Sequence, residues 1–217
     1  MTNQLFFYIF LIPLLTSALA SVRAFRKHWP GPYRQFSIFL FTVLLIELFA
    51  GLWPLWTHRQ FTPPFSKNNY WVYNPFIIIE YLFYIYFFHR ATGGKIFSLN
   101  ISLGIGAGYL VLSLLNLFLL QGMFKYPTHT LAIASLVMVL LTSGYFIALL
   151  RSNKLVRLST EPLFWISVGA FLYHLCCIPL FIFFNYLLRT NIELCLIFFK
   201  ITTVFNWIMY SSYTIAF

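Results

Sequence analysis

Apolar residues along this chain fall into seven long stretches that short polar connections separate. The stretches cover residues 5–22, 36–57, 71–88, 101–123, 131–150, 163–188 and 192–217. A helix needs about 20 mostly apolar residues to cross a bilayer, and each stretch is close to that length. The pattern therefore predicts an all-α membrane protein, in which residues 1–217 form a single domain of seven transmembrane helices. Within the fourth stretch, Gly104, Gly106 and Gly108 predict a face that packs closely on a neighbouring helix.

The composition of the chain excludes a soluble domain. Of the 217 residues, 61% are hydrophobic and 8% are charged, whereas a soluble domain carries about 25% charged residues. The formal net charge of +10 reflects a shortage of acids, because 4 acidic residues oppose 14 lysines and arginines. We therefore expect the chain to lie in a lipid bilayer and not to bind nucleic acid.

Basic residues are distributed unevenly between the connections. The first, third and fifth connections carry most of them, namely Arg23, Arg26, Lys27, Arg34, Arg90, Lys95, Arg151, Lys154 and Arg157. Cytoplasmic connections are enriched in lysine and arginine. The sequence thus predicts a multi-pass protein of the plasma (inner) membrane with its N-terminus outside and its C-terminus cytoplasmic. We interpret residues 5–22 as a span and not as a signal peptide, because no basic residue precedes them and a basic cluster follows.

The last stretch, residues 192–217, contains Lys200 well inside its apolar run. A lysine within the bilayer is costly unless it finds a partner or reaches the interface. Helical steps from Lys200 collect polar residues on one face, which we expect to look into the bundle. These residues are Glu193, Thr203, Trp207, Tyr210, Ser211 and Thr214.

Five ionisable side chains within the predicted helices are candidates for a ligand or proton site. They are Glu47, Glu80, His174, Glu193 and Lys200. The alternative is a bundle held together by a structural ion pair. The predicted topology puts Glu80 and Lys200 at similar depth in the outer half of the membrane, so they are the expected pair, with Glu47 as a reserve partner.

An aromatic wall is expected around Glu80. The residues that share its helical face are Tyr73, Ile77, Phe83, Tyr84 and Phe87. Residues 57–74 add Pro63, Pro64 and several aromatic side chains at the predicted outer surface. This segment fits either an interfacial aromatic belt or a lid over an outward-facing pocket.

The sequence indicates no cofactor and no catalytic motif. His174 and Cys177 lie one helical turn apart and could supply half of a metal site, but the seven stretches contain no second histidine. A hydrogen-bonded core histidine fits better. The chain has no triad spacing, Gly-rich phosphate loop or H-E-x-x-H helix, so an enzyme is unsupported but left open. Lys200 as a retinal Schiff base with Glu80 as counter-ion is another alternative, although Leu196 stands where microbial rhodopsins have an acid.

Three segments resemble a family of small bacterial membrane proteins with seven helices. They are residues 160–166 (TEPLFWI) with Gly169 and Tyr173, residues 70–74 (YWVYN) leading into Glu80 and Tyr81, and residues 206–217. Members of this family are often encoded beside sensor histidine kinases or regulators. The resemblance implies that Glu80 is a ligand or proton site and that Trp165 anchors a helix at the cytoplasmic interface. It implies no role for Lys200 and no catalytic residue.

These observations favour a non-enzymatic sensory or scaffolding module with an outward-facing aromatic cavity around Glu80 and Lys200. Such a module would act through a cytoplasmic signalling partner, and a homo-oligomer is left open. The alternatives are a small transporter or channel, proton-coupled through Glu47, Glu80 or His174, and a membrane-embedded enzyme that acts on lipid. A path that links both surfaces would favour transport, whereas a pocket closed at one end would favour sensing.

Overall fold

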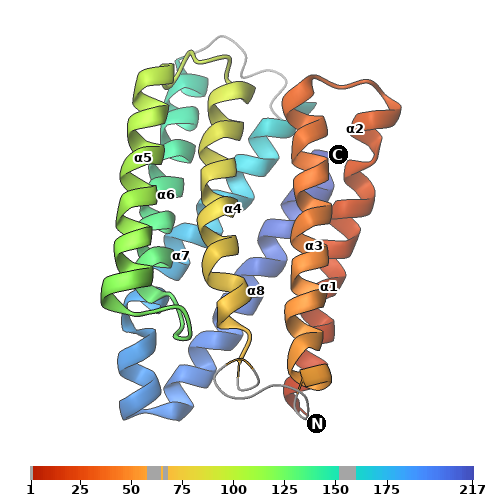
Figure 1. Cartoon of the computed structure of the whole chain (residues 1–217). Coiled ribbons are helices and arrows are strands. Elements are labelled where there is room, and N and C mark those ends of the chain that lie inside the picture. Colours follow the sequence, from red (N-terminus) through yellow and green to blue (C-terminus); the bar gives the residue numbers. More distant parts are fainter. Residues whose placement is uncertain (1, 58–64, 66–67, 152–159) are drawn as a thin grey trace.

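Seven long helices and one four-residue helical turn make up the described part of the chain (Figure 1). The computed structural model describes residues 2–57, 65, 68–151 and 160–217, without the side chains of residues 2–8, 10 and 54–57. The predicted all-α class is confirmed, because each predicted stretch overlaps one long helix. The helices are α1 (Thr2–Ser21), α2 (Arg23–Arg26), α3 (Gly31–Thr57), α4 (Tyr70–Ala91), α5 (Leu99–Leu115) with its π-helical extension η1 (Asn116–Leu120), α6 (Thr128–Leu150), α7 (Pro162–Thr190) and α8 (Ile192–Ala216).

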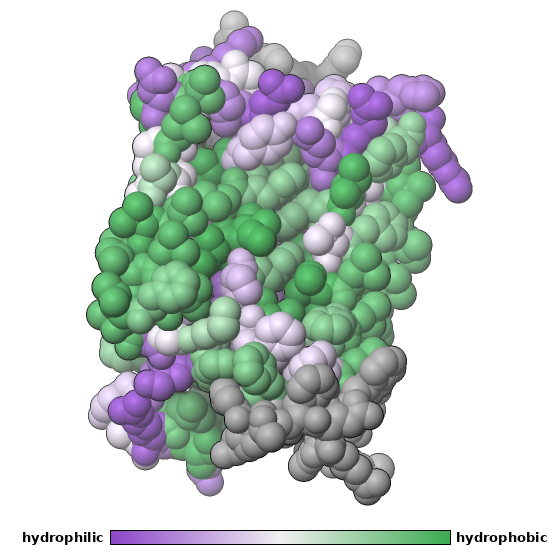
Figure 2. Space-filling model, viewed as in Figure 1, coloured by the Kyte–Doolittle hydropathy of each residue, from purple (hydrophilic) through white to green (hydrophobic). Residues whose placement is uncertain are grey.

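Six of these helices, α3 to α8, are long and apolar enough to cross a membrane. Figure 2 shows the corresponding surface, an apolar flank between more hydrophilic ends. Large apolar side chains are exposed on these helices, among them Leu103, Phe118 and Leu140. Lipid tails would cover them in a membrane. The chain is therefore a multi-pass membrane protein, while the predicted span of α1 stays a prediction because many of its side chains lie outside the described part.

The helices run alternately up and down the bundle (Figure 1). α1 and α3 pack together at one side, and α4, α5 and α6 form the other side. α7 and α8 cross obliquely between these groups, and α8 packs against both α7 and α1. α4 packs on α3, α5 and α6. α8 and the first half of α4 face each other across the interior of the bundle (Figure 1).

Basic side chains gather at one end of the bundle, where α3 begins and α4 and α6 end. This end carries Arg23, Arg26, Lys27, Arg34, Arg90, Lys95 and Arg151. The opposite end carries Lys125 and Arg189 among the described residues. Several residues named in the sequence analysis lie outside the described residues: Pro63, Pro64, Lys154 and Arg157.

Glycine packing differs from the prediction. An added β-carbon at Gly104 or Gly108 would meet no atom within 4 Å, and one at Gly106 would make only an ordinary contact with Leu82 at 3.7 Å, so the predicted close-packing face of α5 is wrong. The close approach occurs instead at Gly169 in α7, where a β-carbon would lie 2.8 Å from Cβ of Ser212 and 2.9 Å from the main-chain oxygen of Met209. Only glycine lets α7 and α8 meet at this distance.

Candidate functional site

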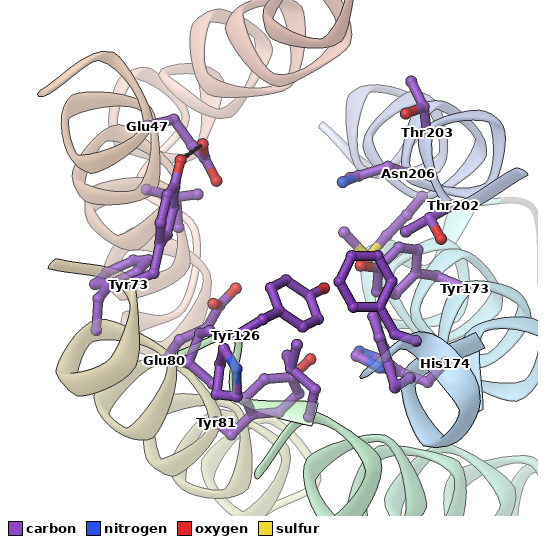
Figure 3. A pocket seen from close by; sticks show the side chains of 18 of the residues that line it. Glu47, Tyr73, Glu80, Tyr81, Tyr126, Tyr173, His174, Thr202, Thr203 and Asn206 are labelled. Atoms are coloured by element: carbon purple, nitrogen blue, oxygen red, sulfur yellow. Dashed lines mark hydrogen bonds between the residues drawn. The ribbon is translucent and has the colours of Figure 1, made fainter. Parts of the chain in front are cut away.

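A cavity of about 410 Å³ lies between α3, α4, α7 and α8 (Figure 3). The connection before α6 also contributes to its wall through Tyr126 and Pro127. Its polar lining includes Glu47, Asn69, Tyr73, Glu80, Tyr81, Tyr126, Tyr173, His174, Thr202, Thr203 and Asn206. Aromatic rings from α4, α7, α8 and the connection before α6 complete the wall. Of the wall predicted around Glu80, Tyr73, Ile77 and Tyr84 line the cavity, whereas Phe83 and Phe87 do not.

The cavity closes toward the basic end of the bundle. Tyr84 lines it, and the Tyr84 hydroxyl lies 3.0 Å from the Tyr213 hydroxyl in a hydrogen bond. Beyond that pair, the ring of Phe36 lies 5.3 Å from Tyr213 and 4.6 Å from Phe87. These three rings are at most 1% exposed. The described residues therefore form a packed plug between the cavity and the basic end.

Glu47 on α3 is tied to α4. The Tyr73 hydroxyl donates a hydrogen bond of 2.6 Å to Oε2 of Glu47 (Figure 3). The two residues come from the second half of α3 and the first turn of α4, so the bond joins the two helices at the cavity wall. Glu47 is thus a cavity residue that already has a donor.

Glu80 is the second acid of the cavity, and its carboxyl group points into the open space (Figure 3). Within residues 2–57, 65, 68–151 and 160–217, no hydrogen bond or ion pair to this carboxyl group is found. Its position inside a membrane-spanning helix makes that isolation costly unless a water molecule or a ligand occupies the cavity.

Lys200 does not pair with Glu80, and the expected ion pair is wrong. Lys200 and Glu193 are exposed on α8, and Trp207 is 38% exposed. None of the three lines the cavity. Two residues of the expected inward face, Thr203 and Tyr210, do line the cavity. The face of α8 that looks inward is rotated from the expected one, and consists of Phe199, Thr202, Thr203, Asn206, Met209 and Tyr210. A Schiff base at Lys200 would lie outside the cavity, so the arrangement does not support a retinal site.

His174 lies in the cavity wall as a hydrogen-bonded histidine. Its Nδ1 is 3.1 Å from the hydroxyl of Ser135 on α6, and its ring makes edge contacts with Tyr81 and Tyr173. Cys177 is buried on the same helix. Among the described residues, no group of three histidine, cysteine, aspartate or glutamate side chains could hold a metal ion. The Ser135 contact matches the predicted core histidine.

Sequence patterns missed several cavity residues. Tyr126 lies in a connection, and Asn206 has a buried Oδ1 without a hydrogen-bond partner among the residues described. The amide of Asn206 points into the cavity (Figure 3). Burial raises the pKa of Tyr126, which keeps its phenol neutral. The spacing of Thr202, Asn206 and Tyr210 at successive helical turns could have identified this face of α8.

Aromatic and amide contacts hold the end of the bundle next to the cavity. The indole nitrogen of Trp53 donates to the main-chain oxygen of Phe65 at 3.0 Å, and the Phe65 ring makes edge contacts with Trp71 and Phe124. Phe65 thus contacts α3, the start of α4 and the connection before α6. The choice between an aromatic belt and a lid stays open.

The bond between Tyr73 and Glu47 should contribute measurably to stability. Tyr73→Phe is expected to lower the free energy of unfolding by about 1 kcal/mol, because a partly buried acceptor loses its donor. In a double-mutant cycle with Glu47→Met, which cannot accept the bond, the coupling energy should be about 1 kcal/mol. Melting in a mild detergent gives the stability of the unchanged protein, the two single variants and the double variant. Tyr86→Phe, which removes an exposed hydroxyl bonded to Gln35, is the control, and strictly additive losses would contradict the bond.

Comparison with known proteins assigns no family. No family model, no curated protein and no solved structure matches the chain. What the structure does establish is a multi-helix membrane architecture. The resemblance to seven-helix bacterial membrane proteins therefore stays a prediction.

Proposed function

We propose that this chain is a non-enzymatic membrane module that binds a small ligand in an outward-facing cavity and acts through a partner protein. The observation that carries the proposal is a cavity with the Glu80 carboxyl group aimed into it and a packed plug between it and the basic end of the bundle. A volume of about 410 Å³ lies within the range of small-molecule sites.

The distribution of charge supports the outward direction. The basic side chains lie at the end of the bundle opposite the cavity. Cytoplasmic connections attract such residues, so the cavity end would face the exterior. Glu47 and Glu80 would then be reached from outside the cell.

α8 offers a route from the cavity to the basic end. Its middle contributes Thr202, Thr203 and Asn206 to the cavity wall. Phe217, directly after its end, stacks on Trp29 with ring centroids 5.6 Å apart. A ligand that shifts α8 would therefore also shift contacts at the proposed cytoplasmic surface, where a signalling partner could read the change.

Cysteine accessibility tests the proposal against a transporter or channel. The native Cys176, Cys177 and Cys195 are replaced by alanine, and Thr203→Cys reports on the cavity. We expect a membrane-impermeant methanethiosulfonate to label it in intact cells but not in inverted vesicles. Ser37→Cys, a near-isosteric change at a fully buried position, is the control and should be labelled from neither side.

Two results would contradict the proposal. Labelling of Thr203→Cys from both faces would favour alternating access or a channel. Absence of labelling from either face would show that no ligand from water reaches the cavity.

A further inference from the structure

The cavity carries acidic groups without a fixed positive charge. Glu47 and Glu80 line it, and its described lining contains no lysine or arginine. The lysine that sequence reasoning placed there, Lys200, is exposed elsewhere on α8. An anionic ligand would meet repulsion from either acid when it is ionised, whereas a cationic ligand would be attracted.

The two acids are not equivalent. Glu47 accepts the Tyr73 hydroxyl at 2.6 Å, so one of its oxygens is engaged by the protein. Glu80 receives no such donor from the described residues and points into the open space. A neutral apolar ligand would leave the Glu80 carboxyl group without a partner in a low-dielectric site, which is unfavourable. A positively charged ligand would supply the missing partner.

The wall around Glu80 is rich in aromatic rings. Tyr81, Tyr84 and Tyr173 line the same cavity, together with Tyr126 and Phe184, whose ring centroids are 4.4 Å apart. Electron-rich ring faces attract ammonium groups, and several such faces around one cation form the aromatic cages that recognise quaternary amines. This attraction does not require the ligand to donate hydrogen bonds.

The size of the cavity argues for an organic cation and against a bare metal ion. A volume of about 410 Å³ exceeds what one metal ion needs. The described residues also offer no cluster of three metal-binding side chains. The remaining polar groups, such as Thr202 and Asn206, could bind hydroxyl or carbonyl groups on the rest of an organic molecule.

From these observations we infer that the ligand is a small organic ammonium ion, with Glu80 as its counter-charge and the tyrosine rings as its cage. The inference rests on the proposed function, since it names the class of ligand for the same cavity. Glu80 would contact the ligand directly. Glu47, held by Tyr73, would add negative potential at the wall.

Binding of defined ammonium probes to the purified protein in an uncharged detergent tests this inference. Choline and benzyltrimethylammonium are the cationic probes, and dimethylbutanol, in which carbon replaces the nitrogen of choline, is the neutral control. We expect the ammonium probes to raise the melting temperature saturably and dimethylbutanol to leave it unchanged. Glu80→Gln should weaken ammonium binding by about tenfold or more, because a charge-assisted contact is lost.

Glu193→Gln is the matched control, since it removes the same charge from an exposed position on α8 and should leave binding unchanged. The melting temperature of each variant without probe shows whether it is folded. Equal binding of choline and dimethylbutanol, unchanged binding by Glu80→Gln, or no ammonium binding at millimolar concentration would overturn the inference. Each of these outcomes contradicts only the class of ligand. The proposed binding function would still hold if Thr203→Cys is labelled from one face only. Failure of that labelling would end the proposed function itself.

Discussion

Replacing Gly169 with alanine is expected to lower the free energy of unfolding by about 1–3 kcal/mol, the usual effect of overpacking a helix contact. The new β-carbon would lie 2.9 Å from the main-chain oxygen of Met209 and 2.8 Å from Cβ of Ser212. Rotation of a side chain cannot move a backbone oxygen, so α7 and α8 would have to separate. Melting followed by tryptophan fluorescence in detergent measures the loss.

Gly104→Ala is the matched control, because a β-carbon there would meet no atom within 4 Å. Alanine favours a helix over glycine by up to about 1 kcal/mol, so this variant should melt at the same temperature or higher. The same substitution is thus expected to act in opposite directions at the two sites. If Gly169→Ala melts like the unchanged protein, the close approach of α7 and α8 is not what holds them together.

The lengths of the helices could be predicted because they depend on a one-dimensional property. A run of apolar residues must match the thickness of the bilayer, and polar connections must interrupt it. The predicted stretch 192–217 and α8, Ile192–Ala216, agree for this reason. The same argument says nothing about which neighbour a given face of the helix meets.

The face of α8 that looks inward could not be predicted from the sequence. Lys200 was expected to look inward, since a buried cation requires a partner. The orientation follows instead from packing, because Met209 and Ser212 meet Gly169 on α7. That contact turns Asn206 toward the cavity and leaves Lys200 exposed. A small-residue contact between helices thus outweighed the preference of one polar side chain, and single-chain periodicity does not report such contacts.

The partners of Glu47 and Glu80 could not be predicted for the same reason. Depth in the membrane could be read from the predicted topology, and it made Glu80 and Lys200 neighbours in height. The directions in which Glu80 and Lys200 point around the bundle could not be predicted from the topology. Glu47, expected as a reserve partner, bonds Tyr73 of the adjacent helix, while Glu80 faces open space. Glu80 lines the cavity together with Tyr73, Tyr81 and Tyr84 of the same helix, while its role as a ligand or proton site stays a prediction.

An open cavity in a membrane protein needs rigid walls, since packing would otherwise fill it. Asparagine side chains provide that rigidity near Tyr126. Nδ2 of Asn74, on α4, donates to the main-chain oxygens of Met123 at 2.8 Å and Lys125 at 3.0 Å. Asn69, directly before the same helix, donates to the main-chain oxygen of Ala50 at 2.8 Å. These bonds fix the connection before α6 and the end of α3 to the start of α4.

Asn74→Asp is therefore expected to destabilise the protein by about 3 kcal/mol or more, although the side chain barely changes in size. The residue is 4% exposed, and the substitution replaces an amide donor by an oxygen that faces two carbonyl oxygens. Both carbonyls lose their donor, and each buried group left without one costs about 1–3 kcal/mol. The variant should melt at a lower temperature, and limited trypsin digestion should cut faster after Lys125.

Asn100→Asp provides the matched control at an exposed position in the first turn of α5. A negative charge near a helix N-terminus is neutral or slightly favourable, so neither melting nor cleavage after Lys125 should change. The ammonium probes add a second readout, because a loosened connection would displace Tyr126 from the cavity wall and weaken their binding. Unchanged melting and unchanged cleavage in Asn74→Asp would show that these bonds do not hold the wall of the cavity.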